Sequence, residues 1–355
     1  MIQRSQNVKK TIPIIVLNWN GLSDTLECMK AVENQTYKEW EVFLIDNHSD
    51  NQEAAILAKE YQQHEQITVI ANDANYGFTE GNNRQLKELL TNPNYTYIAL
   101  LNNDAFPDPN WLEELYLAAE QQQSTMVTSK MINYFQPNKM DNAGHRMLNT
   151  AEIIPIGFEE SIDEYKTPMV NMGACAGACL YSTAMLKDIG LFDNYFSTGY
   201  EDAELGVRAN VLGYKTVYAP KAIVHHKISQ SVSKIRDEEY VLKIQLNIFY
   251  TYFKLMPLGV VLLNIPFLVF KYIMVLILDV LFMRWKFLRI MSMAIYRSFF
   301  SERGRILKAR EVFMKQHQPI SSLMIIQKFE FFLWFDIKRF WKHFIKKQKT
   351  DFEKT

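Results

Sequence analysis

The sequence predicts an α/β fold in which helices flank both faces of a mostly parallel β-sheet. Short apolar runs rich in β-branched residues alternate with segments whose apolar residues recur at helical spacing. This alternation is typical of β-α-β units with right-handed crossovers. Each apolar run also ends in a cluster of polar residues. Because ligands of such sheets bind beyond the carboxyl ends of the strands, these clusters mark the expected site.

Four strands and two helices are expected before residue 105. The strands are 12–17, 41–45, 67–70 and 97–101, and the polar clusters after them are 18–21, 46–50, 72–73 and 102–104. Apolar residues at helical spacing predict helices over 24–34 and around 54–58. Further along the chain, a Gly199-Tyr200 turn precedes an expected helix that begins at Glu201 and ends near Gly213.

Charge is distributed unevenly along this chain of 355 residues. Its 48% hydrophobic and 22% charged content is an ordinary globular balance, and its formal net charge is zero. Residues 284–355, however, hold 17 Lys and Arg against 6 Asp and Glu, which leaves 22 against 33 in the rest. The two parts therefore face different partners. We expect an α/β domain over residues 1–235 and a helical region over residues 236–355.

The polar clusters lack the glycine-rich motifs of common nucleotide sites. No Gly-x-Gly-x-x-Gly follows the first strand and no Gly-x-x-x-x-Gly-Lys-Ser/Thr occurs, which argues against a common dinucleotide fold and a P-loop. Carboxylates and amides can instead bond a base or ribose, and Asp104 can bind a divalent cation that holds a diphosphate. Cys175 and Cys179 lack the partners of a zinc site, so we expect buried free thiols.

A series of short motifs runs through residues 14–226. They are IIVLNWNG at 14–21, LIDN at 44–47, NYGF at 75–78 with GNN at 81–83, LNND at 101–104, GACL at 177–180, GLFD at 190–193, YEDAEL at 200–205 and VHH at 224–226. In this order they resemble the motifs of family 2 glycosyltransferases, which have the Rossmann-like GT-A fold. The branch that they resemble most includes bacterial rhamnosyltransferases, which use deoxythymidine-diphosphate sugars.

The resemblance implies a site for a nucleotide sugar and a divalent metal. Asp46 matches the family's base- and ribose-binding aspartate, and the residues implied in donor binding are Asn18, Asn20, Asp46, Asn47, Asn75, Gly77, Asn83, Asn103, Asp104 and Gly177. Asp104 matches the last acidic position of the metal-binding triplet, and either His225 or His226 matches a histidine that completes the metal shell. Such ligands suit Mn²⁺ and tolerate Mg²⁺. Asn102 stands where many members have an aspartate.

The resemblance also implies an inverting transfer reaction with one carboxylate as base. Asp202 matches the family's catalytic base, and Glu201 is a candidate to orient an acceptor hydroxyl. Taken alone, this pair of carboxylates would more often be a helix N-terminus feature, stabilised by the helix dipole. The alternative function is a catalytically silent nucleotide-sugar-binding or scaffold protein of the same fold, for which Asn102 is the support.

The C-terminal region contains two apolar runs that suggest a membrane. Leu258–Phe270 and Tyr272–Met283 are each too short to span a bilayer. The charges of Lys271 and Asp279 and a helix break at Pro266 favour a re-entrant or interfacial hairpin over one spanning helix.

Residues 329–349 interleave aromatic and basic side chains, which predicts an amphipathic helix for anionic lipid surfaces. The alternative is a helix for homo-oligomerisation or for packing between domains. Nucleic acid is disfavoured because no binding motif accompanies the pattern. The polar first residues argue against a signal peptide. We therefore expect a peripheral or monotopic enzyme on the cytoplasmic face of the membrane. Its expected donor is a dTDP- or UDP-sugar, and its expected acceptor is a lipid-linked glycan of a cell-surface polysaccharide.

Overall fold

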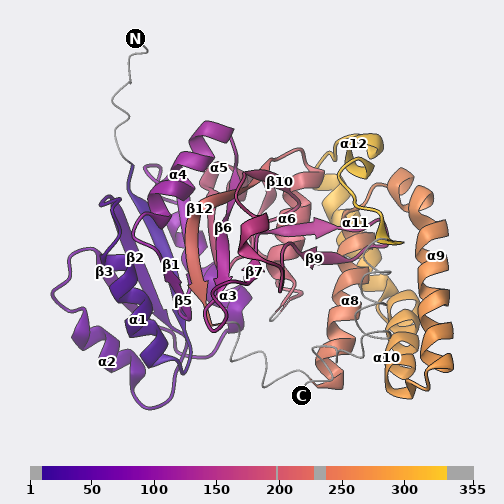
Figure 1. The fold of residues 1–355 in the computed structure, drawn as a ribbon, viewed down its shortest axis with the longest axis horizontal. Helices are drawn as coiled ribbons and strands as arrows, with labels where there is room; N and C mark the ends of the chain where they lie inside the picture. The colour runs from indigo at the N-terminus through magenta and orange to yellow at the C-terminus, as the bar shows by residue number, and fades with distance from the viewer. Residues whose placement is uncertain (1–9, 197–198, 228–236, 334–355) are drawn as a thin grey trace, which may run out of the picture. The chain divides into compact units, whose positions relative to one another are not determined.

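The computed structural model describes residues 10–196, 199–227 and 237–333. The chain divides into two compact units, and Figure 1 labels the elements of both. The first unit comprises Met1–His145, Pro155–Ala209 and Tyr214–Ile228, and the second comprises Arg146–Ile154, Asn210–Gly213 and Ser229–Thr355. Two short segments that precede residue 235 therefore belong to the second unit.

The first part of the first unit confirms the four expected strands and the two expected helices to within two residues at each end, and it adds a third helix, Gly77–Leu89, that was not expected. Its elements are β1 (Ile12–Asn18), α1 (Leu22–Glu33), β2 (Trp40–Asp46), α2 (Glu53–Glu60), β3 (Ile67–Ala71), α3 (Gly77–Leu89) and β4 (Tyr97–Asn102). β1 pairs in parallel with both β2 and β4, and β2 pairs in parallel with β3. The carboxyl ends of these strands therefore lie at one edge of the sheet, as the alternating pattern predicts.

The rest of the sheet mixes strand directions. The remaining elements are β5 (Ala105–Pro107), α4 (Trp111–Gln122), β6 (Met126–Asn133), β7 (Met140–Asn142), β8 (His145–Met147), β9 (Ile153–Pro155), η1 (Ile162–Glu164), β10 (Met169–Asn171), β11 (Ala178–Ser182), α5 (Thr183–Ile189), α6 (Glu201–Val211) and β12 (Thr216–His226). The strand order is β10-β12-β6-β11-β4-β1-β2-β3, while β5 pairs with β12 and β7 with β6; β8 and β9 form a separate two-stranded sheet. β11 is antiparallel to both β4 and β6, so it joins the parallel half of the sheet to the β6–β12 pair.

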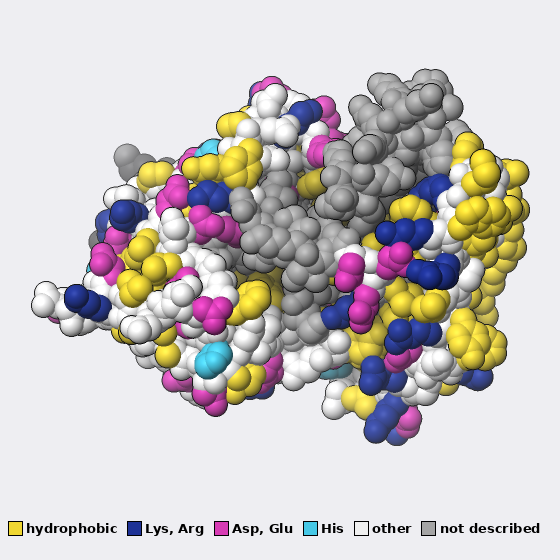
Figure 2. Space-filling view, turned by 90° about the horizontal axis from the view of Figure 1, so that it is seen from below, with side chains coloured by type: hydrophobic (Ala, Val, Ile, Leu, Met, Phe, Trp, Pro, Cys, Tyr) yellow, Lys and Arg dark blue, Asp and Glu magenta, His cyan; other side chains and the backbone are white. Residues whose placement is uncertain are grey.

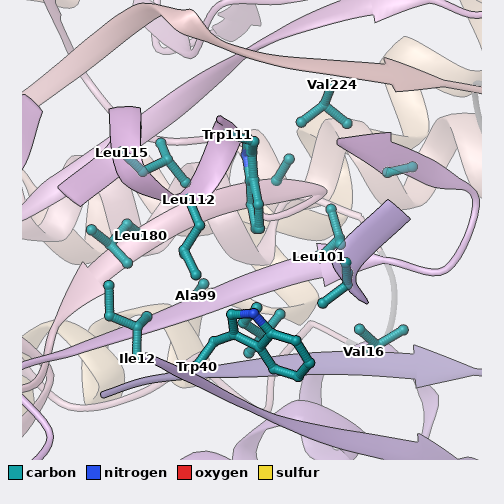
Figure 3. Close-up of a cluster of buried hydrophobic side chains, with 14 of the residues drawn as sticks. Ile12, Val16, Trp40, Ala99, Leu101, Trp111, Leu112, Leu115, Leu180 and Val224 are labelled. Atoms are coloured by element: carbon teal, nitrogen blue, oxygen red, sulfur yellow. The ribbon is translucent and has the colours of Figure 1, made fainter. Parts of the chain in front are cut away.

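Helix α4 packs its apolar side on the centre of this sheet. Trp111, Leu112 and Leu115 are fully buried against β4 residues such as Ala99 and Leu101 (Figure 3). The indole nitrogen of Trp111 donates a hydrogen bond of 2.8 Å to the Ser129 hydroxyl, so its polar atom is satisfied inside the core. This packing holds β4, β6 and β12, whose ends carry several of the predicted site residues.

The second unit is mainly helical. Its helices are α8 (Glu238–Leu255), α9 (Leu258–Leu281), α10 (Trp285–Tyr296), the π-helical turn η2 (Arg297–Ser301), α11 (Arg303–Gln316) and α12 (Ser322–Ile326). Asp237 caps α8 by accepting a hydrogen bond from the Tyr240 amide. The amphipathic helix expected over residues 329–349 lies almost entirely outside the described residues.

The expected hairpin with a break at Pro266 is wrong. Residues 258–281 form one helix of 24 residues that contains Pro266 in its interior. A proline removes a single backbone hydrogen bond, and the long helical segments on both sides retain the others. Within the described residues, α9 is the one helix long and apolar enough to cross a membrane by length and composition.

Candidate active site

Asn18 joins the loops that follow β1 and β2. Its side chain is completely buried, and its amide group donates hydrogen bonds of 2.8 Å to Asp46 and 2.9 Å to Glu53. Its amide oxygen accepts from the Thr25 hydroxyl at 2.8 Å and from the Gly21 backbone at 3.2 Å. Asn103 also donates to Thr25, at 3.0 Å. Asn18, a predicted donor-binding residue, therefore holds the polar loops at this edge of the sheet together through its hydrogen bonds.

Asp46 is buried and bonded within the same loops. The side chain of Asp46 is 1% exposed. One carboxylate oxygen accepts from Asn18, and the other accepts from the Ser49 amide at 2.9 Å. In this structure the carboxylate therefore orders the loop after β2. Its role in base and ribose binding stays a prediction. Asn20 is exposed and exchanges two hydrogen bonds with Asp50 in the same loop.

Asn47 organises the entrance to α3. Its amide group donates to the Asn75 side chain at 2.9 Å and to the Gly77 carbonyl at 3.2 Å. Its amide oxygen accepts from Asn72 and from the Tyr76 backbone. Gly77 has a φ of 66°, in the left-handed region that glycine adopts without strain, and α3 begins there. The structure thus brings Asn47, Asn75 and Gly77 together, as the motif pattern implies.

Asn83 lies away from that network, on the buried side of α3. It donates to the Phe192 carbonyl at 2.9 Å and to Asn194 at 3.1 Å, and it accepts from the Phe192 amide at 3.2 Å. Asn83 is 2% exposed. Its observed contacts therefore hold the loop after α5 against α3.

Asp104 faces His226 across a short strand pair. β5 begins one residue after Asp104, and its register places Ala105 opposite His226. The Nε2 atom of His226 lies 3.2 Å from a carboxylate oxygen of Asp104, and its Nδ1 atom lies 2.7 Å from Asp141 on β7. His226 is thus enclosed between two carboxylates at the end of β12.

These carboxylates make the His226 position favourable for a positive charge. Burial lowers the pKa of His226, but its two carboxylate partners outweigh this effect and raise the pKa to about 10. For Asp104, burial raises the pKa, yet His226 and Lys227 together hold it below its ordinary value. When Asp141 accepts the Nδ1 proton of a neutral His226, Nε2 presents its lone pair toward Asp104.

His225 points elsewhere. Successive side chains alternate along a strand, so the two histidines at the end of β12 face opposite sides. The Nε2 atom of His225 lies 3.3 Å from Asp108, and both side chains are more than one third exposed. The sequence left the choice between the two histidines open, and the geometry places His226 beside Asp104.

Asp202 occupies the first turn of α6. One of its oxygens accepts a hydrogen bond of 3.0 Å from the Ala176 amide, and the other accepts from the Ala203 amide at 2.7 Å. Its side chain remains 18% exposed, whereas Glu201 is buried at 6%. Tyr200, just before them, has a φ of 83°, a conformation that is rare for a residue with a side chain. Such strained positions cluster at functional sites.

His145 lies beside Asp202, with its Nε2 atom 4.0 Å from the carboxylate. Its Nδ1 atom is buried and has no hydrogen-bond partner among the described residues. Burial lowers the pKa of His145, although the charge of Asp202 opposes this effect. A neutral imidazole therefore borders the predicted base.

The small residues between 173 and 178 allow close backbone approach. A Cβ atom at Gly206 on α6 would lie 2.3 Å from the Gly173 Cα atom. A Cβ atom at Gly177 would lie 2.9 Å from the Met131 side chain, and the Gly177 carbonyl accepts from the Asn102 amide at 2.8 Å. The run thus connects the end of β4 with the start of α6, where Asp202 is held.

Cys175 lies in this same run. Burial raises the pKa of its thiol well above the ordinary value, and the charges of Asp202 and Asp141 raise it further. Cys179 is buried, Cys175 is partly buried, and both are free thiols. The expected free thiols are therefore present, but by exposure only Cys179 of the two is fully buried.

Sequence reasoning missed Asp141 and His145. Both lie between β6 and β10, in a segment of short strands that gives no clear periodic pattern. Their partners His226 and Asp202 are 85 and 57 positions away in the chain, so only the fold reveals the pairs. The one signal in the sequence that could have indicated these two residues is the number of polar side chains in the loop-rich segment between β6 and β10.

Comparison with known proteins identifies a family to which part of the chain is similar. Residues 14–190 match the family Glycosyl transferase family 2. The bifunctional glycosyltransferase pgtA of Dictyostelium discoideum is 26% identical over 125 residues, which are 35% of this chain and 16% of that protein. This chain therefore matches about one sixth of that relative's length.

A solved structure gives the same fold. The crystal structure of GalNAc-T7 with UDP, GalNAc and Mn²⁺ superposes with a TM-score of 0.54 and 14% sequence identity, over 70% of this chain and 50% of that one. At this identity the likeness shows the fold alone, a mostly parallel sheet flanked by helices as in GT-A enzymes. Residues 14–190 of this chain therefore form a family 2 glycosyltransferase domain with a GT-A-like fold.

Proposed function

We propose that the chain is a metal-dependent inverting hexosyltransferase in which Asp202 acts as the general base. The observation that carries this proposal is the position of Asp202 in the first turn of α6. Two backbone amides fix its carboxylate, yet part of the side chain is exposed. A base must be held firmly and still reach the acceptor hydroxyl. Glu201 is more deeply buried, which favours Asp202 over Glu201 as the base.

The reaction requires one proton acceptor. As the acceptor oxygen attacks the anomeric carbon, its proton moves to Asp202 and a new carbon–oxygen bond forms. The bond from the anomeric carbon to the diphosphate oxygen breaks on the opposite side, which inverts the configuration and releases the nucleoside diphosphate. Neutral His145 beside Asp202 adds no positive charge that would weaken the base.

The chemistry of Asp104 and His226 fits a divalent metal. A carboxylate oxygen and an imidazole nitrogen are ligands that Mn²⁺ accepts, and Asp141 orients the imidazole. Within the described residues no group of three His, Cys, Asp or Glu side chains could hold a metal, so the donor diphosphate and water would complete the shell. The Mn²⁺ and UDP named for the GalNAc-T7 structure support this assignment. The metal, when bound, offsets the negative charge of the leaving diphosphate.

The donor and acceptor follow from the motif resemblance. A dTDP- or UDP-sugar is the proposed donor, with rhamnose as the candidate sugar. A lipid-linked glycan destined for a cell-surface polysaccharide is the proposed acceptor. The basic C-terminal region supports an acceptor at the cytoplasmic face of a membrane.

Purified protein tests the base assignment. Asp202→Asn should lower the rate of donor hydrolysis or transfer by about 10² to 10⁴-fold, because the amide cannot take the proton. Thermal stabilisation by the donor with Mn²⁺ should persist, since the substitution keeps the side chain's size. Asp163→Asn, at an exposed carboxylate paired with Lys166, is the matched control and should keep full activity.

Three results would contradict parts of this proposal. Equal rates for Asp202→Asn and the wild type would remove the base assignment. Donor binding without turnover of any nucleotide sugar would favour the silent scaffold. A screen of nucleotide sugars for thermal stabilisation with Mn²⁺ would identify the base and sugar, because a ligand of the folded state raises its stability. A preference outside dTDP- and UDP-sugars would overturn the donor proposal.

A further inference from the structure

Helix α9 has its polar residues on the inside. Asn264, Lys271 and Asp279 are its strongly polar residues, and each is only 3–4% exposed. Their separations of seven and eight positions place them on one side of a helix. Leu268 and Tyr272 are buried on the same side. The side of α9 that packs against the rest of the second unit thus contains every strongly polar side chain of the helix.

The opposite side of α9 is apolar and exposed. Ten of its large apolar residues are between 42% and 68% exposed, namely Leu258, Leu262, Leu263, Ile265, Val269, Phe270, Ile273, Ile277, Val280 and Leu281. We call this set the α9 apolar face. Figure 2 shows hydrophobic side chains gathered at this side of the second unit, with lysines and arginines beside them. A helix on the surface of a water-soluble protein has its apolar residues inside and its polar residues outside. A contiguous exposed apolar surface of this kind marks an interaction site.

The charge near the α9 apolar face indicates the partner. Residues 284–316, which include α10 and α11, contain nine Lys and Arg and two Asp and Glu. Trp285 and Tyr296 on α10 are each 60% exposed, and amphipathic aromatic rings of this kind favour the lipid headgroup region. A second copy of the chain would bring the same positive charge to the interface. Anionic lipid is complementary to it.

We propose that the second unit binds the surface of an anionic lipid bilayer through the α9 apolar face, with the helix in the plane of the membrane. A helix of 24 residues is about 36 Å long and could in principle cross the hydrocarbon core of about 30 Å. The contacts of Lys271 argue against crossing. Lys271 pairs with Glu152 and lies 3.4 Å from the Thr150 hydroxyl, both on the loop between β8 and β9.

The buried side extends along the whole helix, from Val260 to Asp279. A spanning position would therefore draw Glu152, Lys271 and the loop into the hydrocarbon, where charged and irregular segments are costly. Lying in the plane, α9 inserts only its apolar face and leaves these groups in the protein. This binding mode concerns the second unit and does not depend on the sugar transferred.

Vesicle flotation of the full chain tests this surface. Wild-type protein should float with vesicles of phosphatidylcholine and phosphatidylglycerol, and less with phosphatidylcholine alone. The triple variant Leu262→Gln, Val269→Gln and Ile273→Gln removes apolar area from the centre of the face, and its partition coefficient should fall at least about tenfold. The control triple variant Ile56→Gln, Leu117→Gln and Val170→Gln changes exposed apolar residues of the first unit and should float like the wild type. Unchanged thermal unfolding of both variants would show that they fold.

A labelling experiment tests the orientation. Pro257→Cys and Met283→Cys place a thiol just beyond each end of α9, where Pro257 is partly exposed and Met283 is exposed, and neither residue belongs to the α9 apolar face. On sealed vesicles with bound protein, a membrane-impermeant maleimide added outside should modify both positions. Protection of one end alone would show a spanning helix and overturn the in-plane orientation.

Other outcomes would overturn the proposal that the α9 apolar face binds lipid. Wild-type protein that fails to float with anionic vesicles, or a Gln triple variant that floats equally well, would each do so. A wild-type dimer that the Gln triple variant converts to a monomer, without flotation of either, would assign the face to a second copy. Flotation only after removal of residues 334–355 would assign it to that segment of the chain.

Discussion

Asp141 shows how a residue outside the motifs can control the site. It accepts the Nδ1 proton of His226 in the neutral tautomer, and so it fixes which nitrogen faces Asp104. Partners of this kind orient the ligands of a metal and raise their basicity. Asp141 is therefore a positioning residue for the proposed metal ligand.

Asp141→Ala should weaken Mn²⁺ binding by about 10 to 100-fold, because His226 loses its orienting partner. Asp141→Asn should retain more affinity, since an amide oxygen still accepts the imidazole proton. Titration of Mn²⁺ by calorimetry in the presence of a nucleoside diphosphate would measure both. Similar affinities for Asp141→Ala and wild type would exclude the positioning role.

The two adjacent histidines offer a direct comparison. His226→Ala should abolish most of the dependence of activity on Mn²⁺, because it removes the nitrogen beside Asp104. His225→Ala should leave that dependence within about twofold, because surface substitutions away from a site change little and His225 pairs with Asp108 instead. Initial rates over a series of Mn²⁺ concentrations test this. The reverse result would transfer the metal ligand to His225.

At the scale of elements, the contact of α6 with the small-residue run sets the position of Asp202. Gly206 and Gly173 approach so closely that neither position has room for a side chain. The obstructing atoms belong to the backbone, so they cannot move aside as a flexible side chain would. The start of α6 is therefore fixed relative to the Ala176 amide that binds Asp202.

Gly206→Ala should destabilise the protein by about 1–3 kcal/mol or more and lower activity, because the added methyl group overpacks this contact. Gly304→Ala is the matched control, since it is also a helical glycine but has no atom within 4 Å of an added Cβ. It should stabilise α11 by up to about 1 kcal/mol. Urea unfolding followed by circular dichroism would compare the two. A neutral Gly206→Ala would contradict the close contact.

At the scale of the whole molecule, the C-terminal residues are basic and the remaining residues are acidic. Residues 284–355 have a surplus of 11 positive charges, and the remaining residues have a surplus of 11 negative charges. On the proposed membrane surface, the basic part would attract anionic lipid while the α9 apolar face inserts. The two contributions respond differently to salt.

Raising the salt concentration from about 0.05 to 0.5 M should reduce binding to anionic vesicles without abolishing it. Salt screens the attraction between basic residues and lipid headgroups, whereas burial of the apolar face persists. Flotation across a salt series would measure this. Complete release at high salt would show that the apolar face contributes nothing.

Local patterns were enough to predict the α/β class, the strands over 12–17, 41–45, 67–70 and 97–101, and the edge of the sheet that carries the polar loops. These features follow from local periodicity, because a strand buried on both faces must be apolar and must end where polar side chains begin. The ordered motifs likewise indicated the family that residues 14–190 match.

The tertiary structure was needed for the features that depend on contacts between distant segments. It placed His226, and not His225, beside Asp104 through the pairing of β5 with β12, and it showed Asp141 beside His226 and His145 beside Asp202. It also replaced the expected hairpin by the single helix α9, whose polar residues turn inward to meet groups such as Glu152. The sequence shows which residues are polar, but their hydrogen-bond and ion-pair partners are set by packing between segments far apart in the chain.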